Sequence, residues 1–281
     1  METIWKDDTI MMRSLYTAAT GMRAQQINVD NISNNLSNVN TVGYKTQKAE
    51  FKSLLYQTIQ TRTTTANGEQ KPIAAQVGLG TRIASNTAIF TQGPLQASES
   101  MSDFAISGAG FFAVRGADGQ TYYTRNGRFN WGIGPTGVTL TSSDGCPVLD
   151  TNGNPIVLPA GITSENAVVT ENGQIGYMND EGLFVDLNQQ FGLFQFNNPG
   201  GLEREAGSLY SVTDASGGPL NEANVEGLIP SKVVQGYLEG SNVQVADEMV
   251  NLIVAQRAYQ LNSKAITTSD EMLEQANNLR R

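Results

Sequence analysis

Hydrophobic side chains recur every seven positions at both ends of this chain, whereas its middle alternates between short apolar runs and polar turns. Two apolar rows with this spacing lie near the amino terminus: Leu15, Met22, Val29 and Leu36 in one, and Ala18, Ile32 and Val39 in the other, which Gln25 interrupts. A seven-residue repeat of this kind predicts a helix that pairs along an a/d seam. We expect the helix to end where Asn38, Asn40 and Gly43 supply residues that tolerate a left-handed backbone.

The last forty residues carry the same signature. Their main apolar row consists of Val245, Leu252, Tyr259, Ile266 and Leu273. The companion row is less apolar and consists of Met249, Gln256, Ser263 and Asp270. Ser241 and Gln244 have the spacing of a capping box, in which the two side chains satisfy free backbone N–H groups, so a helix is predicted to begin directly after them. The two terminal helices are expected to pair with each other as a coiled coil.

Between the ends, turn dipeptides alternate with β-branched and aromatic runs such as FFAV, QTYYT and NAVVT. The dipeptides are Asp118-Gly119, Asn126-Gly127, Asp144-Gly145, Asn152-Gly153 and Asn172-Gly173. Two successive positive-φ positions suit Asn or Asp followed by Gly, so these pairs indicate tight hairpin turns. The pattern predicts a mainly antiparallel β body over residues 85–235.

Residues 46–84 fit neither pattern. AEFKSLLYQTI is compatible with a helix or an extended strand, and QTRTTTANGEQKPIAAQVGLGT is expected to be an exposed loop or a long hairpin. The predicted fold class is α+β. Its expected segments are an extension over residues 1–10, a helical part over 11–45, an extended or loop linker over 46–84, the β domain over 85–235 and a second helical part over 236–281. We expect the two helical parts to form one inner core domain.

Composition narrows the possible functions. The net charge is -9 with a pI near 4.6, and the few basic residues are scattered, which argues against a nucleic-acid surface. The chain has no histidine, so the commonest general base and the commonest transition-metal ligand are missing. Its one cysteine, Cys146, has no nearby His or Cys with which to hold zinc. We therefore expect no catalytic residue, no cofactor, no metal and no small-molecule substrate.

No segment reaches the roughly 18 apolar residues of a membrane span, and the start METIWKDDTIMMRSLY lacks a signal-peptide core. Composition alone would place such a protein in the cytoplasm. Some exported proteins, however, have no cleaved signal.

The terminal helices are expected to be incomplete on their own. Burial of one narrow seam does not clearly exceed the entropy that about 70 ordered residues lose, because backbone ordering alone costs about 1–2 kcal/mol per residue. Identical subunits packed around the pair would cover its remaining faces, so we interpret the stripe as an assembly element that orders on polymerisation. The asparagines of NISNNLSNVN have two readings: amides that cross-link crowded helices, or a plain helix end with solvated side chains.

Two long segments make the chain resemble the bacterial flagellar rod, hook and hook-associated axial proteins. SLYTAATGMRAQQINVDNISNNLSNVNTVGYK (14–45) is similar to the amino-terminal signature of that family, and QGYLEGSNVQVADEMVNLIVAQRAYQLNSKAITTSDEML (235–273) to its carboxy-terminal signature. TQGPLQ (91–96), DFAISGAGFFAV (103–114) and YTRNGRFN (123–130) resemble motifs of its β body. The family's usual start aligns near Met11, so residues 1–10 are extra, and residues 130–200 match only loosely.

Within the group, LLYQTI (54–59), QVGLGTR (76–82) and EGSNVQVADEMVNLI look most like the distal rod proteins, with proximal rod or short hook-type proteins as the alternative. The resemblance implies a structural protein whose copies assemble helically into a straight, rigid drive shaft and export channel that links the motor to the hook. Its implied partners are further copies, the proximal rod proteins and the hook protein along the axis, and the surrounding basal-body rings. It also implies export through the flagellar type III apparatus without a cleaved signal, to a basal body that spans the periplasm.

The expected assembly contacts combine the seam with the asparagines: Leu15, Met22, Val29, Ile32, Asn34, Asn35, Leu36, Asn38, Val245, Met249, Leu252, Tyr259, Ile266 and Leu273. The resemblance further implies a rod-stiffening segment that contains Tyr56, Gln57, Thr58, Ile59, Gly78 and Gly80.

Two functions of other classes remain open from the residues. One is a β-rich hydrolase with paired carboxylates, drawn from Asp118, Asp144, Asp150, Glu171, Asp180 and Glu181, although most of these occupy turn positions. The other is a surface adhesin whose helices only oligomerise it. An adhesin predicts closed oligomers of fixed size, whereas a rod protein predicts open-ended polymers.

Overall fold

The computed structural model describes residues 4–60, 75–134, 137–159, 166–179, 183–225 and 227–278. The chain divides into two compact units. The first, here called the terminal unit, comprises Met1–Leu36, Gln47–Thr87 and Val245–Arg281. The second, the β unit, comprises Ser37–Thr46 and Ala88–Gln244. The segment predicted to lie between helix and β body therefore belongs with the two helices.

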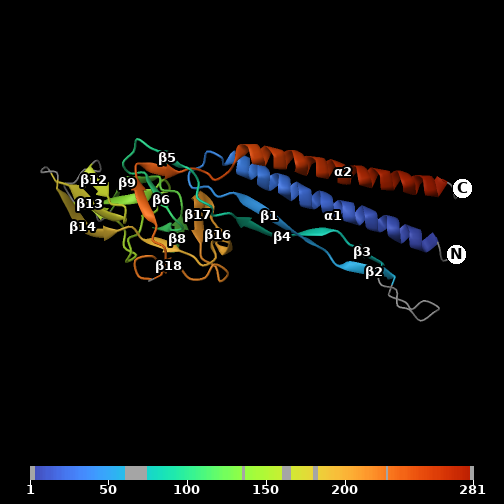
Figure 1. Cartoon of the computed structure of the whole chain (residues 1–281), viewed down its shortest axis with the longest axis horizontal. Coiled ribbons are helices and arrows are strands. Elements are labelled where there is room, and N and C mark those ends of the chain that lie inside the picture. The colour runs from blue at the N-terminus through green and yellow to red at the C-terminus, as the bar shows by residue number, and fades with distance from the viewer. Residues whose placement is uncertain are drawn as a thin grey trace. The chain divides into compact units, whose positions relative to one another are not determined.

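Helices α1 (Ile4–Ser37) and α2 (Val245–Asn278) lie side by side in the terminal unit (Figure 1). Three cross-helix contacts fix their register: Ser14 to Ser269, Gly21 to Asn262 and Asn35 to Glu248. A step of seven or fourteen residues along α1 matches an equal step backward along α2, so the helices run antiparallel. Neither helix, over its described residues, is long and apolar enough to cross a membrane.

Both helix ends differ in detail from the predicted signals. Helix α2 begins at Val245, so Ser241 lies outside its first turn, and its hydroxyl accepts the N–H of Val243 instead of forming a capping box. Helix α1 ends at Ser37, and Asn38 and Asn40 are not among the described residues with positive φ. Gly43 alone adopts the left-handed conformation there, with φ 69°. A Cβ on Gly43 would lie 2.7 Å from the Arg125 backbone, so this glycine permits a close approach of two chain segments.

The segment after α1 forms a two-stranded ribbon. Strand β1 (Gln47–Ser53) pairs with β4 (Thr81–Ala88), and β2 (Tyr56–Gln60) pairs with β3 (Ala75–Gly78). Hydrogen bonds from Leu54 N–H to Gly80 O and from Leu79 N–H to Leu55 O join the two halves. Of the two possibilities for AEFKSLLYQTI, the extended strand is correct. Residues 61–74, which include most of the predicted loop, lie outside the described part.

Over its described residues, the β unit contains five small sheets. Its largest has the order β16-β17-β8-β7-β15-β18, and the others are β11-β10-β9, β12-β13-β14, β19-β6 and β20-β5. The strands are β5 (Leu95–Ala97), β6 (Phe104–Ser107), β7 (Phe111–Arg115), β8 (Thr121–Thr124), β9 (Phe129–Gly134), β10 (Gly137–Ser142), β11 (Val157–Leu158), β12 (Ala167–Val169), β13 (Gln174–Met178), β14 (Phe184–Gln190), β15 (Leu193–Gln195), β16 (Glu203–Arg204), β17 (Leu209–Ser211), β18 (Leu220–Asn221), β19 (Lys232–Gln235) and β20 (Tyr237–Glu239). Every pairing between these strands is antiparallel, which confirms the prediction of an α+β chain with an antiparallel β body.

Strand β7 separates two hydrophobic clusters. Phe112 and Val114 point into one cluster, and Phe111 and Ala113 into the other. Both faces of the strand are therefore buried, which explains why FFAV reads as an unbroken apolar run.

Four of the five predicted turns are hairpins, but of a different type from the one expected. They contain Gly119, Gly145, Gly153 and Gly173, each with φ near 80°. In each turn, the backbone carbonyl of the residue three positions before the glycine accepts the glycine N–H. The backbone N–H of that same residue donates to the carbonyl of the residue that follows the glycine. Only the glycine has positive φ, so these are three-residue turns that end in a bulge. Asn126-Gly127 is not a hairpin, because Gly127 lies against the carbonyl of Phe104.

Candidate assembly surface

A stripe of large apolar side chains lies exposed on α2. Its members are Val250, Val254, Leu261 and Met272, with Ile253 beside them, and Leu261 is 68% exposed. The buried residues of the helix, Glu248, Ala255 and Ser269, occupy the opposite face. Several large apolar side chains exposed on one face of a helix are typical of surfaces that bind another protein. We call these five residues the α2 stripe.

Sequence reasoning missed the α2 stripe because it followed only the two rows of the predicted seam, and neither row contains a residue of the stripe. MVNLIVAQRAYQL contains apolar residues on every side, and a helix that is hydrophobic all round is normally buried all round. This helix has more apolar positions than one seam can bury, and that surplus is the sequence signal that could have revealed the stripe.

The predicted seam residues divide into three groups in the structure. Ile32 is buried; Leu15, Met22, Val29, Leu36, Leu252, Ile266 and Leu273 are half-buried; Val245, Met249 and Tyr259 are exposed. The predicted companion row on α2 was wrong. The row that faces α1 contains Glu248, Ala255, Asn262 and Ser269, since the helices approach each other through small and polar residues.

The asparagines cross-link chain segments inside the terminal unit. Asn35, 1% exposed, donates to Gln47 O at 2.9 Å and accepts Gln47 N–H at 2.9 Å. Its amide also donates to Glu248 Oε1 at 3.4 Å. Asn31 exchanges hydrogen bonds with Asn86 of β4. Of the two readings of these amides, cross-linking is therefore correct for Asn31 and Asn35. Asn38 contacts the Thr41 hydroxyl in the turn after α1, and Asn34 is exposed.

Glu248 is a buried carboxyl group on the helix seam. Burial raises its pKa above the ordinary value, and the hydrogen bond from Asn35 opposes that shift. A neutral, protonated Glu248 is thus easier to bury here than the carboxylate.

The predicted stiffening residues lie along the ribbon. Tyr56 is 61% exposed, and Gln57 and Thr58 are also exposed. Ile59 belongs to β2, with its side chain outside the described part. Gly78 faces the ring of Tyr56, and Gly80 sits against Thr20 of α1 so closely that an added Cβ would collide with the Thr20 hydroxyl. The ribbon therefore rests on α1 at Gly80 and presents apolar groups to solvent beyond it.

A groove of about 390 Å³ separates α1 from β4. Its lining consists of Tyr16, Thr20, Arg23, Ala24, Ile27, Leu54, Thr81, Arg82 and Ile83. Ala24, Ile27, Leu54 and Ile83 are the aliphatic residues of this lining, and its two charged residues are both arginines. We call it the ribbon groove. A second cavity, of about 360 Å³, lies between the helices and includes Val29 and Tyr259.

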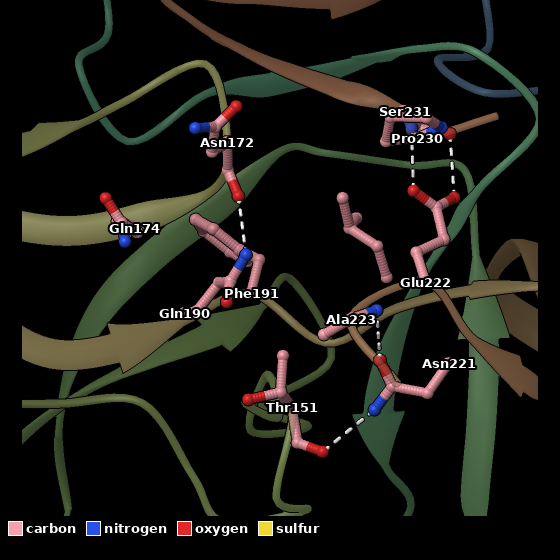
Figure 2. A pocket seen from close by; sticks show the side chains of 11 residues that line it. Thr151, Asn172, Gln174, Gln190, Phe191, Asn221, Glu222, Ala223, Pro230 and Ser231 are labelled. Carbon is pink, nitrogen blue, oxygen red and sulfur yellow. Dashed lines mark hydrogen bonds between the residues drawn. The ribbon is translucent and has the colours of Figure 1, made fainter. Parts of the chain in front are cut away.

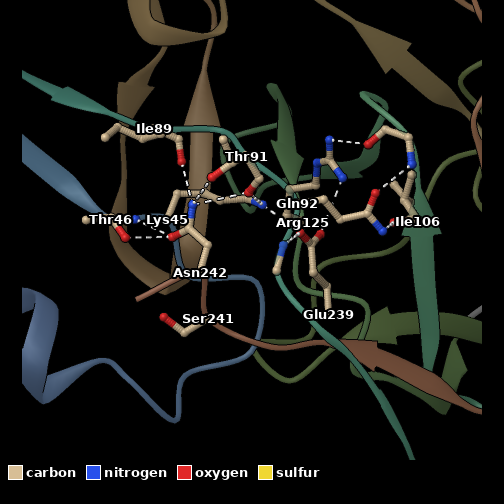
Figure 3. A network of polar contacts seen from close by, with 12 residues as sticks. Lys45, Thr46, Ile89, Thr91, Gln92, Ile106, Arg125, Glu239, Ser241 and Asn242 are labelled. Atoms are coloured by element: carbon tan, nitrogen blue, oxygen red, sulfur yellow. Dashed lines mark hydrogen bonds and ion pairs between the residues drawn. The ribbon is translucent and has the colours of Figure 1, made fainter. Parts of the chain in front are cut away.

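In the β unit, a buried ionic network joins the segment after α1 to the segment before α2 (Figure 3). Lys45 Nζ lies 2.6 Å from Glu239 Oε1 and donates to Thr91 O at 2.8 Å. Arg125 contacts Glu239 Oε2 at 3.3 Å and donates to Gly108 O at 2.8 Å. Burial lowers the pKa of both Lys45 and Arg125, and the Glu239 carboxylate opposes both shifts. One anion thus holds two cations that come from separate parts of the sequence.

Asn242 makes a second link beside this network. Its Oδ1 accepts both the N–H and the hydroxyl of Thr46, at 2.8 Å and 2.7 Å. Its Nδ2 donates to Ile89 O and Thr91 O (Figure 3). Both the oxygen and the nitrogen of this amide are used, so Thr46, which directly precedes β1, is held to Asn242, which shortly precedes α2.

A polar pocket of about 260 Å³ also lies in the β unit (Figure 2). Glu222 is the one carboxylate among its lining residues, and the Ser231 N–H and hydroxyl bind it at 2.6 Å and 2.8 Å. A paired-carboxylate hydrolase needs a second acid about 5–10 Å away, which this lining does not supply. Asp118 and Asp150 instead accept backbone N–H groups of their own turns, and Asp180 and Glu181 lie outside the described part. In the described ranges, no three His, Cys, Asp or Glu side chains cluster as metal ligands would.

Three family descriptions match parts of this chain. The description "Flagella basal body rod protein" matches residues 15–45, and "Flagellar hook protein FlgE/F/G D1 domain" matches residues 105–177. "Flagellar basal body rod FlgEFG protein C-terminal" matches residues 234–279. All the residues of the ionic network lie in or close to these matched segments.

Curated relatives match over nearly the whole length. The flagellar basal-body rod protein FlgG of Borreliella burgdorferi is 42% identical over 96% of this chain and 100% of its own. The protein of the same name from Agrobacterium fabrum is 41% identical over 93% of this chain and 97% of its own. The flagellar hook-basal body complex protein FlhP of Bacillus subtilis is 32% identical over 96% of this chain and 100% of its own.

Proposed function

Because this chain belongs to the flagellar basal-body rod protein family, as an axial structural protein of the rod, we propose that its copies assemble helically into the distal rod. Identity to the relatives named FlgG (42%) exceeds identity to the hook-basal body protein (32%), which favours the distal rod over a hook-type role. The polymer serves as a straight, rigid drive shaft and as a channel for exported subunits. Its axial neighbours are the proximal rod proteins and the hook protein, inside the rings of the basal body.

In this proposal the helix pair continues as an antiparallel coiled coil that forms the inner wall of the tube. The α2 stripe is the observation that supports self-assembly most directly, since five large apolar side chains on a paired helix have no cover within their own unit. The predicted contacts on α1 and α2 and the exposed ribbon around Tyr56 would lie between neighbouring copies. The ribbon adds lateral contacts, which resist bending.

The experiment compares two isoleucines on the purified full chain. Ile253 belongs to the α2 stripe, and Ile229 is an equally apolar, 85% exposed residue of the β unit. We expect Ile253→Asp to raise the concentration needed for polymerisation by roughly tenfold or more, because a buried unpaired charge is costly. Ile229→Asp should leave it unchanged. Sedimentation and electron microscopy measure both. Closed oligomers of fixed size, or equal effects of the two substitutions, would contradict the proposal.

A further inference from the structure

We propose that Asn242 is a positioning residue that stiffens the rod, because it holds the chain segments that connect the two units. This inference rests on the rod function proposed above and names a residue that makes the shaft rigid. The chain crosses from one unit to the other four times, after Leu36, Thr46, Thr87 and Gln244. Free residues at such crossings would act as a hinge, since a hinge consists of a few residues whose φ and ψ can change.

On the β unit, Asn242 binds the ends of three crossings (Figure 3). Its Oδ1 accepts the N–H of Thr46, the last residue before the second crossing, at 2.8 Å. Its Nδ2 donates to the carbonyl of Ile89, just after the third crossing, also at 2.8 Å. Asn242 itself lies just before the fourth crossing, and Ile89 N–H donates to Thr46 O at 2.9 Å. We call this set of contacts the Asn242 clamp.

On the terminal unit, two other asparagines bind their own ends of the crossings. Asn35, just before the first crossing, exchanges two hydrogen bonds of 2.9 Å with the backbone of Gln47, the first residue after the second crossing. Asn86, just before the third crossing, donates to Gln47 Oε1 at 3.1 Å. Asn35 also donates to Glu248, just after the fourth crossing, at 3.4 Å. All four crossings are thus tied together in this unit.

Few residues lie between these two sets of contacts. At the second crossing, the N–H groups of the adjacent residues Thr46 and Gln47 are each accepted by an asparagine Oδ1. At the third crossing two residues, 87–88, lie between bound positions, and at the fourth two residues, 243–244, precede α2. Only the first crossing, which contains the turn after α1, is longer. The other three leave too few free residues for a hinge.

A shaft has to pass torque through these crossings, because they are the covalent connections between the units. Segments that are tied together carry the torque jointly, whereas separate segments would each twist about their own φ and ψ. An amide suits this role, since its oxygen accepts an N–H of one segment while its nitrogen donates to a carbonyl of another. The stiffness of the rod therefore depends on the Asn242 clamp as well as on contacts between copies.

The experiment removes the Asn242 amide from the full chain and measures how the polymers bend in electron micrographs. Asn221→Ala is the matched control, because Asn221 is also a half-buried amide of the β unit that joins distant segments. It donates to Thr151 O and accepts the N–H of Ala223, both at 3.0 Å. We expect Asn242→Ala to shorten the persistence length of the polymer at least about twofold, because the crossings become hinges. Asn221→Ala polymers should be as straight as the parent.

Two further measurements separate the clamp from a loss of stability. In dilute solution, the Thr46 amide should exchange roughly tenfold faster in Asn242→Ala than in the parent, since it loses one hydrogen bond. Leu140, fully buried in the core of the β unit, supplies a destabilised variant without a change at the crossings. Leu140→Ala should lower the urea midpoint of the β unit and still give straight polymers.

The outcomes separate this inference from the rod function. Straight polymers of Asn242→Ala, or equally bent polymers of Leu140→Ala, would overturn the stiffening role and leave the rod function standing. Unchanged exchange at Thr46 would overturn the clamp itself. A parent chain that never polymerises would overturn the rod function and the stiffening role together. If Asn242→Ala does not polymerise alone, its copolymers with the parent should bend more as its share increases, and copolymers that stay straight would contradict the inference.

Discussion

At the scale of single residues, Glu239 determines whether two buried cations can be accommodated. Lys45, Arg125 and Glu239 have almost no solvent exposure, and the carboxylate contacts both partners. Removing one member of a buried ionic group leaves the others without compensation, which is more costly than losing an exposed pair.

Glu239→Gln should therefore lower the free energy of unfolding of the β unit by about 3–5 kcal/mol. The matched control is Glu171→Gln, which breaks the exposed pair between Glu171 and Lys232 and should change the free energy of unfolding far less than Glu239→Gln does, because solvent screens an exposed pair. Urea unfolding followed by tyrosine and tryptophan fluorescence measures both. Equal losses in the two variants would show that burial of the network is unimportant.

A second residue-scale prediction concerns pH. Burial raises the pKa of Glu248 above its ordinary value of 4.5, so the folded state binds the proton more tightly than the unfolded state. The stabilising contribution is fully present below pH 4.5 and is lost as pH rises through the raised pKa. Glu248→Gln keeps an acceptor for Asn35. Near pH 4, polymers of this variant should dissociate on heating at the same temperature as the parent polymers. Near pH 8, they should dissociate at a higher temperature than the parent polymers.

That comparison has a built-in control in Asp270→Gln, an exposed acid on the same helix. Its polymers should follow the parent at both pH values. A parent whose dissociation temperature does not differ from that of Glu248→Gln at pH 8 would rule out a raised pKa.

At the scale of elements, the sequence predicted which segments are helices and strands better than which faces they bury. Leu252 and Ile266 lie in the predicted row, but the facing row is Glu248, Ala255, Asn262 and Ser269. Small and polar residues give no hydrophobic signal, although they let two helices approach closely. The ribbon was left open because YQTIQ and AQVG are too short to show a period.

The predicted seam retains a direct test. Ile32→Asp combined with Leu252→Asp should leave a folded β unit that fails to polymerise, because both charges fall on the helix pair. Circular dichroism of the β unit and sedimentation of the mixture report the two properties separately. Normal polymers from this double variant would contradict a role for the seam.

The sequence also could not predict the network around Glu239, whose three charged residues are separated by 80 and 114 positions. Each appears in an apparently ordinary motif: NTVGYK, YTRNGRF and GYLEGSN. Only the fold shows that these motifs meet. The turns, in contrast, could be predicted from local sequence, since four of the five Asp-Gly and Asn-Gly pairs form hairpins. Each of these hairpin turns has three residues, with a bulge, where two were expected.

At the scale of the whole molecule, the two units are expected to gain stability in different ways. The β unit buries two aromatic-rich clusters of its own. The terminal unit leaves the α2 stripe and the ribbon groove uncovered. A unit that needs neighbours for cover becomes fully stable only on assembly.

Hydrogen exchange should separate the two units. In dilute solution, we expect backbone amides in the described strands of the β unit to be protected and those of α1 and α2 to exchange several orders of magnitude faster. Polymerisation should slow exchange in both helices and leave the β unit unchanged. Full protection of the helices in a chain that never polymerises would contradict the assembly proposal.

The position of Glu239 near the end of the sequence has a consequence for secretion. If the chain leaves a narrow conduit with its amino terminus first, Lys45 and Arg125 emerge long before the carboxylate that neutralises them. The β unit then cannot form its ionic network until all but about the last forty residues have passed. A network that forms this late would keep the β unit unfolded during transit and let it fold only after the chain reaches the growing tip.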